Sequence, residues 1–321
     1  MRLAETVTFG GSALERAAER RGDERAQKAM WADPSARVLL VWRGKLPVLG
    51  ETGERLIWLA TDDPLVAQAS ERIFLGLDDG APRFATTLSG WEPEGFDAEV
   101  AKAFFDPNVY PHPGLPEGNR FAELRGVMTA LSPRDAELAV TAKALFNWHA
   151  THRFCARCGA ESAMAMAGWQ RGCPDCGGQH FPRTDPVVIM LITHGNAVLV
   201  GRSQGWPEGM YSLLAGFVEP GETLEAAVRR EVAEETGILV GAVDYLASQP
   251  WPFPNSLMFG CQGEALTTDI TIDPAEIEDA RWVEREEMVR VFAGEHPELR
   301  RPRNGAIAHF LMLNWLADRL D

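Results

Sequence analysis

The chain reads GFVEPGETLEAAVRREVAEETGI from residue 216 to residue 238. Gly221 suits a tight turn, and Thr223 is a favourable N-cap residue for a helix that begins just after it. Gly237 is a favourable residue just past a helix C-terminus. We therefore expect a helix at about residues 223–236.

Three acidic side chains of this expected helix can converge on one cation. Glu231, Glu234 and Glu235 stand at positions i, i+3 and i+4, so their carboxylates share one face. The opposite face is apolar and suits a core. Neighbouring negative charges repel, a divalent cation relieves that repulsion, and oxygen ligands suit Mg²⁺ or Mn²⁺ better than zinc. For a bare acidic cluster, a solvated helix face is the alternative.

Length and composition indicate an ordinary globular protein. The 321 residues are about twice the size of a typical domain, which predicts two domains or two with a small insert. The composition excludes a collagenous, disordered or coiled-coil chain. Lysine and arginine number 31 against 46 acidic residues, a net charge of −15, which disfavours a broad nucleic-acid-binding surface. An anionic substrate would need local help from metal cations.

Targeting signals are not evident in the sequence. The N-terminal residues lack the apolar core of a secretory signal, and the longest apolar runs are of strand length, so no membrane span is expected. Five cysteines, four of them in two close pairs, favour a metal site over disulfides. The expected location is the cytoplasm.

The order of elements predicts three regions. Residues 1–132 form a β-rich domain, with strands expected at 37–42, 55–60, 72–77 and 83–88. Residues 133–181 contain a helix from Pro133 to about Arg153 and the cysteine segment. Residues 182–321 form a third domain, with strands expected at 186–193, 196–203, 243–248 and 257–265 and a last helix near 304–318.

Four cysteines predict one structural zinc site per chain. They form two C-x2-C pairs separated by fourteen residues: Cys155, Cys158, Cys173 and Cys176. Four thiolates complete the zinc tetrahedron and leave no open position, so such a site is structural. Gly159 and Gly172 suit the tight turns of the pairs. We expect His180 to be a loop histidine rather than a ligand, and Cys261 to be a buried free thiol.

The spacing of the acidic helix resembles a known motif. Gly216, five residues, Glu222, seven residues and then RE-V-x-EE-x-G-I match the Nudix box, G-x5-E-x7-R-E-U-x-E-E-x-G-U, without departure. The resemblance implies a Nudix hydrolase of the α/β (α+β) class, a mixed sheet between helices, which cleaves a nucleoside diphosphate linked to another group.

The same resemblance implies roles for individual residues. Glu231, Glu234 and Glu235 would hold the catalytic cations. Arg230 would pair with Glu222 in support, and the backbone carbonyl of Ala215 would add a ligand. Glu276, in a loop further along the chain, would be another metal ligand, although a solvated loop acid is the alternative.

Three features narrow the resemblance to the NADH pyrophosphatase branch. They are the SQPWPFPNS array at 248–256, the HFPRTDP segment at 180–186, and the four cysteines ahead of the box. The resemblance covers residues 125–318, whereas residues 1–124 match only loosely. Prolines stiffen the array and can hold Trp251 and Phe253 for stacking on planar bases; for an isolated array, aromatics turned into the core are the alternative.

The branch resemblance implies a set of substrate-binding residues. Phe181 and Phe217 would flank a nicotinamide or adenine ring, and Phe181 lacks the hydroxyl of the Tyr that some members carry. Ala308 would touch substrate through its backbone, and Arg125 is a weaker candidate for a phosphate or ribose contact. The array itself would line the dinucleotide pocket through Gln249, Pro250, Trp251, Pro252, Phe253, Pro254, Asn255 and Ser256.

The expected activity is Mg²⁺- or Mn²⁺-dependent hydrolysis of NADH or NAD⁺ to nicotinamide mononucleotide and AMP. The resemblance also allows removal of NAD caps from RNA 5′ ends and favours a homodimer. One alternative is hydrolysis of ADP-ribose or another nucleoside diphosphate derivative. Another is a catalytically silent sensor, which should have eroded carboxylates, and none is eroded here.

Overall fold

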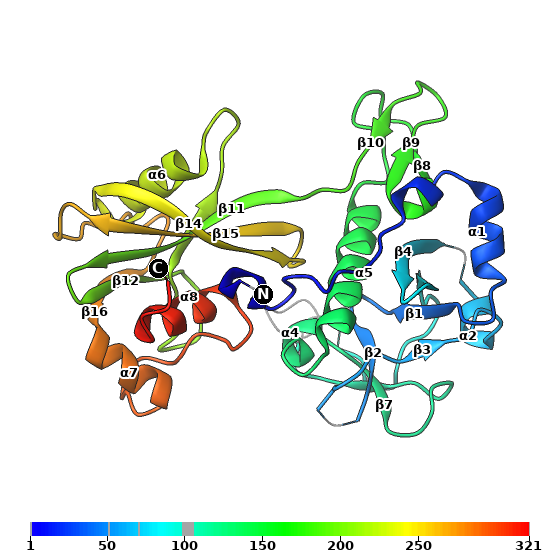
Figure 1. The fold of residues 1–321 in the computed structure, drawn as a ribbon, viewed down its shortest axis with the longest axis horizontal. Helices are drawn as coiled ribbons and strands as arrows, with labels where there is room; N and C mark the ends of the chain where they lie inside the picture. The colour runs from blue at the N-terminus through cyan, green and yellow to red at the C-terminus, as the bar shows by residue number, and fades with distance from the viewer. Residues whose placement is uncertain (1, 51, 70, 98–105, 321) are drawn as a thin grey trace. The chain divides into compact units, whose positions relative to one another are not determined.

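The computed structural model describes residues 2–50, 52–69, 71–97 and 106–320 (Figure 1). The chain divides into two compact units. The C-terminal unit comprises Met1–Gly10, Thr184–Trp251 and Ser256–Asp321, and the N-terminal unit comprises Gly11–Arg183 and Pro252–Asn255. Within the described residues, the structure contains no helix with the length and apolar character that a bilayer crossing requires.

The C-terminal unit is built on a mixed six-stranded sheet in the order β14-β15-β11-β12-β16, with β13 paired to β11. β11 runs parallel to β15, and the other pairs are antiparallel. The strands are β11 (Asp185–His194), β12 (Ala197–Arg202), β13 (Leu214–Phe217), β14 (Val240–Trp251), β15 (Ser256–Ala265) and β16 (Asp279–Glu284).

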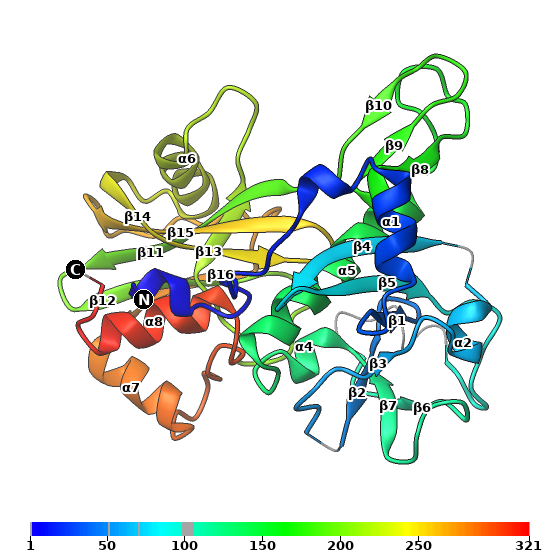
Figure 2. The same ribbon diagram turned by 45° about the vertical axis from the view of Figure 1, so that its right-hand side comes forward.

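Helices cover both faces of this sheet, as Figures 1 and 2 show. They are α6 (Leu224–Thr236) on one face and α7 (Arg285–Ala293) and α8 (Ile307–Leu316) on the other, with the short η1 (Leu3–Thr6) beside them. The alternation of β11 explains the two cores, because successive side chains point to opposite faces. Val188 and Met190 pack with α6, whereas Ile189 and Leu191 pack on the α7 and α8 side. The expected mixed sheet between helices is confirmed.

Several elements of this unit differ from the sequence-based expectation. β14 extends to Trp251 and includes Pro250, which is tolerated because β14 lies at the edge of the sheet. β13, β16 and α7 were not predicted. The two strands are short, at four and six residues, and do not show a clear apolar alternation.

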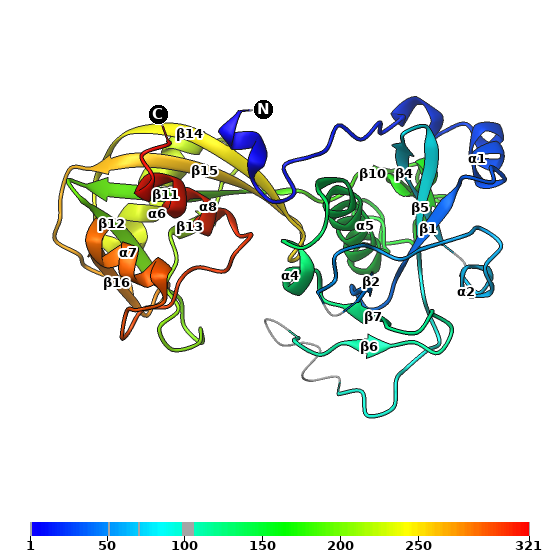
Figure 3. The same cartoon turned by 60° about the horizontal axis from the view of Figure 1, so that its bottom comes forward.

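The N-terminal unit contains the four expected strands in one sheet, ordered β3-β1-β5-β4, and a second sheet ordered β2-β7-β6. The strands are β1 (Arg37–Val41), β2 (Leu46–Leu49), β3 (Trp58–Leu59), β4 (Arg72–Asp78), β5 (Ala81–Thr87), β6 (Tyr110–Pro111) and β7 (Asn119–Ala122). Its helical elements are η2 (Ala18–Arg20), α1 (Glu24–Trp31), α2 (Pro64–Ala67), α4 (Leu124–Val127) and α5 (Pro133–Thr151). Figure 3 shows α5 running beside these sheets.

The cysteine segment forms a small three-stranded sheet that is anchored on α5. It consists of β8 (Ala163–Ala165), η3 (Met166–Gly168), β9 (Gln170–Gly172) and β10 (Gln179–His180). Buried Arg171 donates to Ser162 Oγ at 2.8 Å and to His149 Nδ1, on α5, at 3.1 Å. Burial lowers the pKa of His149 to about 4, so its ring is neutral and Nδ1 can accept this hydrogen bond.

Candidate active site and zinc site

The helix of the acidic motif begins and ends where its sequence predicts. Thr223 is the N-cap of α6, and its hydroxyl accepts a hydrogen bond from the backbone N–H of Ala226 at 3.3 Å. Gly237 closes the helix in the left-handed region with φ 72°, and Gly221 makes the preceding turn with φ 91°. The glutamates therefore lie on a helix that is capped at both ends.

Arg230 organises the carboxylates around this helix. Its guanidinium donates to both oxygens of Glu222, at 2.9 and 2.8 Å. It also donates at 2.9 Å to Glu231, to Glu234 and to the backbone carbonyl of Phe217. A planar guanidinium with five fixed N–H donors suits such a junction. Arg230 thus links the motif loop, the helix and the end of β13.

The carboxylate of Glu235 is buried and, within the described structure, lacks a full set of hydrogen bonds. Its side chain is 8% exposed, and its Oε2 atom has no hydrogen-bond partner among the described residues. Burial is the largest cause, and together with the negative charges of Glu231, Glu276 and Glu234 it raises the pKa of Glu235 to about 8. An ionised carboxylate in this place requires a positive charge nearby.

Glu276 lies in the loop that packs on the last turn of α6. The backbone N–H of Asp273 donates to the carbonyl of Glu235 at 3.2 Å, and the N–H of Glu276 donates to the carbonyl of Asp273 at 3.1 Å. Glu276 helps to raise the pKa of both Glu235 and Glu231, for each of which burial is the first cause. The structure therefore brings Glu276 into the electrostatic neighbourhood of the helix glutamates.

These residues fit a divalent cation of the Mg²⁺ or Mn²⁺ kind. All the side-chain ligand atoms are oxygens, and within the described part of the chain one buried carboxylate oxygen has no hydrogen-bond partner. Ala215 lies on β13, opposite Ile189 of β11, one residue before the glycine that packs against Glu231. The residues that would hold the cation are Glu231, Glu234, Glu235, Glu276 and the carbonyl of Ala215.

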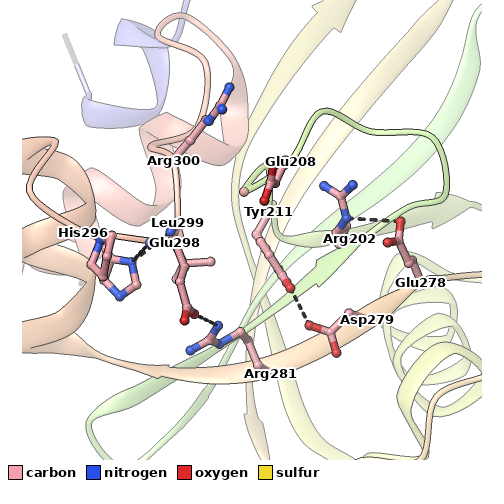
Figure 4. A pocket seen from close by; sticks show the side chains of 12 residues that line it. Arg202, Glu208, Tyr211, Glu278, Asp279, Arg281, His296, Glu298, Leu299 and Arg300 are labelled. Carbon is pink, nitrogen blue, oxygen red and sulfur yellow. Dashed lines mark hydrogen bonds and ion pairs between the residues drawn. The ribbon is translucent and has the colours of Figure 1, made fainter.

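A different pocket of this unit, of about 780 Å³, borders the loop that carries Glu276 (Figure 4). Several of its charged side chains pair with one another. Tyr211 donates to Asp279 at 2.5 Å, Arg202 pairs with Glu278 at 3.1 Å, and Arg281 pairs with Glu298 at 3.2 Å. These three carboxylates have partners that Glu235 Oε2 lacks, so the cation site is the better supported of the two.

Two of the expected substrate residues of this unit, Phe217 and Gln249, differ in solvent exposure. Phe217 is 58% exposed at the end of β13, as a stacking platform would be. The Gln249 side chain is fully buried: its amide donates to the carbonyls of Thr8 and Gly305, at 2.8 and 2.9 Å, and accepts from the N–H of Ile307 at 2.8 Å. This side chain holds the segment before the buried Ala308 in place.

The SQPWPFPNS array is divided between the two units. Pro250 and Trp251 end β14, and Ser256 begins β15, whereas Pro252–Asn255 belong to the N-terminal unit. Asn147, on α5, donates to the carbonyls of Pro252 and Pro254 at 3.3 Å each. Asn255 is buried and donates to the carbonyl of Ala144 at 3.1 Å. Prediction from sequence did not identify Asn147, because its partners lie more than 100 residues away.

Two further expected substrate residues also belong to the N-terminal unit. Phe181 follows β10 and is 66% exposed, which leaves its ring available for stacking. Arg125, on α4, forms an ion pair with Glu123 at 3.2 Å, and its guanidinium lies over the Phe253 ring at 4.1 Å from the centroid. The structure thus joins Arg125 to the proline-rich array.

The four predicted zinc ligands are assembled in the N-terminal unit. All four sulfur atoms lie within 4.8 Å of one another, with Cys155 and Cys176 at 3.6 Å and Cys158 and Cys173 at 3.5 Å. Four sulfurs at about 2.3 Å from one ion, at the corners of a tetrahedron, lie about 3.8 Å apart. The cluster matches that geometry and is too wide for disulfides, whose sulfurs are about 2.05 Å apart.

The two cysteine loops have the same backbone pattern. Gly159 follows one pair with φ 81°, and Gly177 follows the other with φ 69°. The expectation for Gly172 is wrong, because it lies in β9 and the turn glycine of the second pair is Gly177. His180 is on β10 rather than in a loop, and its Nε2 lies 3.2 Å from Cys155 Sγ, where it can donate a hydrogen bond to a zinc thiolate.

Three family models match the chain, one after another. A "NADH pyrophosphatase-like rudimentary NUDIX domain" matches residues 35–148 and a "NADH pyrophosphatase zinc ribbon domain" matches 150–181. A "NUDIX domain" model matches residues 182–304. The model that matches residues 35–148 assigns the N-terminal β-rich region to a known type of domain, for which the sequence motifs predict no role.

Named relatives agree with these models. The NAD-capped RNA hydrolase NudC of Stutzerimonas stutzeri is 40% identical over 203 residues, which cover 63% of this chain and 70% of that protein. The human NAD-capped RNA hydrolase NUDT12 is 40% identical over 243 residues, which cover 71% of this chain and 50% of that protein. The human mitochondrial NAD(P)H pyrophosphatase NUDT13 is 38% identical over 208 residues, 61% of this chain and 59% of that protein.

This chain spans about half the length of NUDT12, whereas the match covers more than two thirds of the bacterial NudC protein. The chain therefore belongs to the Nudix hydrolase family, in its NADH pyrophosphatase branch.

Proposed function

We propose that the protein hydrolyses the pyrophosphate of NADH or NAD⁺, giving nicotinamide mononucleotide and AMP, with Mg²⁺ or Mn²⁺ as the catalytic cation. Two observations on Glu235 carry this proposal: the negative charges of Glu231 and Glu276 act on its carboxylate, and its buried Oε2 atom has no hydrogen-bond partner among the described residues. The names of the relatives, which act on NAD-capped RNA or NAD(P)H, support the choice of substrate.

When bound, the cation would offset the negative charge of the pyrophosphate and lower the pKa of a water molecule. The protein's contribution is to hold oxygen donors in a fixed arrangement. Arg230 keeps Glu222, Glu231 and Glu234 in place through hydrogen bonds of 2.8 to 2.9 Å. Phe217, exposed beside this junction, can orient a planar ring.

Removal of NAD caps from RNA is a second proposed activity, because it breaks the same pyrophosphate bond and two of the relatives are named for it. Hydrolysis of ADP-ribose is the alternative within the enzyme class. Chromatographic analysis of products from NADH, ADP-ribose and NAD-capped RNA, in parallel reactions with Mg²⁺ or Mn²⁺, separates the three. If none of the three substrates is converted to a product, the result would favour a catalytically silent sensor.

A first prediction concerns the glycine that opens the motif. A Cβ at Gly216 would overlap the carboxylate of Glu231, so Gly216→Ala must displace that carboxylate. We expect up to about a hundredfold loss of kcat, because small displacements of catalytic groups have large effects. Gly172→Ala is the control, since its added Cβ meets open space. Equal kcat values for the two variants would show that the position of Glu231 is not critical.

A second prediction concerns selectivity. If Trp251 helps to form the dinucleotide pocket, Trp251→Ala should lower kcat/KM for NADH about tenfold to a hundredfold, the effect of losing about 1–3 kcal/mol of stacking. Hydrolysis of a small pyrophosphate substrate should change much less. Kinetics on both substrates and a melting curve check this. Equal losses on both substrates in a folded variant would make Trp251 a structural residue.

We also propose that the protein is a cytoplasmic homodimer. None of the five cysteines forms a disulfide: four make up the zinc cluster and Cys261 is a buried thiol, which suits a reducing compartment. The dimer is an expectation from the branch resemblance, and light scattering coupled to size-exclusion chromatography tests it. A monomer at micromolar concentration would contradict this part of the proposal.

A further inference from the structure

The loop that carries Glu276, here residues 273–278 and called the Glu276 loop, is tied to the end of α6. The backbone N–H of Asp273 donates to the carbonyl of Glu235 at 3.2 Å. The carbonyl of Asp273 in turn accepts from the N–H groups of Glu276 and Ile277, at 3.1 Å each, and Ile277 is buried. These contacts fix the loop to the helix that carries the other glutamates.

Two residues at the C-terminal end of β12 hold the Glu276 loop from the other side. The side-chain amide of Gln204 donates to the carbonyl of Pro274 at 2.8 Å. The carbonyl of Arg202 accepts from the N–H of Glu278 at 2.8 Å, and Arg202 Nε donates to Glu278 Oε2 at 3.1 Å (Figure 4). Pro274 lies two residues before Glu276, and Glu278 lies two residues after it. The contacts from β12 therefore flank Glu276.

The side chain of Arg202 is itself held in one position. It is 14% exposed, and a planar guanidinium that is bound on several sides has little freedom to rotate. Besides Glu278, the guanidinium binds three backbone carbonyls of the loop between β12 and β13: those of Trp206, Pro207 and Met210. That loop leads to β13, which contains Ala215. Arg202 thus connects the two segments that would supply cation ligands from outside α6.

We propose that Arg202 and Gln204 are positioning residues for Glu276. By fixing the loop on both sides of Glu276, they hold its carboxylate in place before a cation binds. This inference rests on the proposed function, in which Glu276 is a ligand of the catalytic cation. Glu276 faces the negative charges of Glu231 and Glu235, so a loop released from β12 would let it move away. The loop would then become ordered only on cation binding, and the conformational entropy lost in that step would weaken the binding.

Binding of Mn²⁺ to the full-length, zinc-loaded protein, measured by electron paramagnetic resonance without substrate, tests this proposal. Glu278→Gln removes the ion pair with Arg202 and should weaken Mn²⁺ binding about tenfold, the lower end of the effect of groups that support metal ligands. Glu208→Gln is the matched control, because Glu208 borders the same pocket and, in the described part of the chain, forms no hydrogen bond or ion pair. Equal Mn²⁺ affinities of the two variants would overturn the proposal.

A second variant removes the contact on the other side of Glu276 and leaves Arg202 unchanged. Gln204→Ala deletes one neutral hydrogen bond of an exposed side chain, so Mn²⁺ binding should weaken about twofold to tenfold. Gln68→Ala is its control, because the exposed Gln68 donates in the same way to the carbonyl of Pro64, at 3.1 Å, in the N-terminal unit. If both proteins bind Mn²⁺ equally well, Gln204 has no positioning role.

A double-mutant cycle separates the positioning of Glu276 from a general effect on the fold. In the Glu276→Gln protein the charge of the ligand is already absent, so adding Glu278→Gln should change Mn²⁺ affinity by less than about twofold. A structural role unrelated to Glu276 would lower the affinity by the same factor in both backgrounds. Equal factors, or an unchanged Mn²⁺ affinity of Glu276→Gln alone, would contradict the inference.

Turnover of NADH supplies an independent readout. At saturating Mn²⁺ the loop is ordered even without its ion pair, so kcat of Glu278→Gln should stay within about twofold of wild type, while half-maximal rate should require about tenfold more Mn²⁺. A loss of kcat that persists at saturating Mn²⁺ would show that Glu278 does more than position the loop, against the proposal. If the wild-type protein hydrolyses none of the tested substrates, the proposed function fails, whereas the Mn²⁺ titrations still decide whether β12 positions Glu276.

Discussion

Glu235→Gln should lower kcat for NADH by at least about a hundredfold at saturating Mg²⁺, while the protein stays folded. The reason is that Glu235 has a buried carboxylate oxygen without a hydrogen-bond partner in the described structure, and that the negative charges of three other glutamates act on it. A bound cation contributes several kcal/mol of charge stabilisation, and each 1.36 kcal/mol is a factor of about ten in rate. Glutamine has the same shape and lacks that charge.

The control for this variant is Glu225→Gln, an exposed position in the first turn of the same helix. It removes one charge from α6 without touching the cluster, so its kcat should stay within about twofold of wild type. Adding Glu234→Gln to Glu235→Gln should cost much less than the product of the two single effects, because groups of one metal cluster act as a unit. Near-normal turnover of Glu235→Gln at saturating metal would refute the assignment.

The glutamate helix could be predicted closely because its signals are local. Thr223 and Gly237 mark its ends through their own hydrogen bonds and backbone angles, and the i, i+3, i+4 spacing places three carboxylates together. The four cysteines are similar, since each pair forms its own tight loop. In both cases, residues close in sequence determine the geometry, and the fold only has to bring two such segments together.

Long-range contacts could not be predicted in this way. The buried amide of Gln249 bonds to the carbonyl of Thr8, 241 residues away, and Asn147 holds carbonyls more than 100 residues further along the chain. A stiff proline-rich array is visible in the sequence, but its division between the two units is not. Such partners depend on how strands and helices pack, which sequence patterns do not specify.

The type of the N-terminal domain could not be predicted from sequence motifs. Its four expected strands are present, yet alternating apolar residues are common to many β-rich folds, and no catalytic motif marks this one. Its similarity to a rudimentary Nudix domain became evident only by comparison with the family model.

Loss of zinc should have the largest effect on stability. Cys176→Ser removes one of four converging thiolates, and we expect it to abolish the bound zinc and to unfold the ribbon at residues 155–180. Structural zinc sites contribute about 10–16 kcal/mol of apparent binding free energy, which exceeds or equals the total stability of most domains. The ribbon has three strands of two or three residues and cannot supply this free energy by burial alone.

Zinc content by elemental analysis and thermal melting, both on protein purified without chelator, measure this effect. Wild type should hold one zinc per chain, and Cys176→Ser should hold none and melt at a clearly lower temperature. Cys261→Ala is the control: it removes a buried thiol of the C-terminal unit that lies outside the cluster, so it should keep its zinc. Because His180 Nε2 lies 3.2 Å from Cys155 Sγ, His180→Phe should weaken zinc binding without abolishing it. A Cys176→Ser protein that retains zinc and melts with wild type would show that three thiolates and His180 suffice.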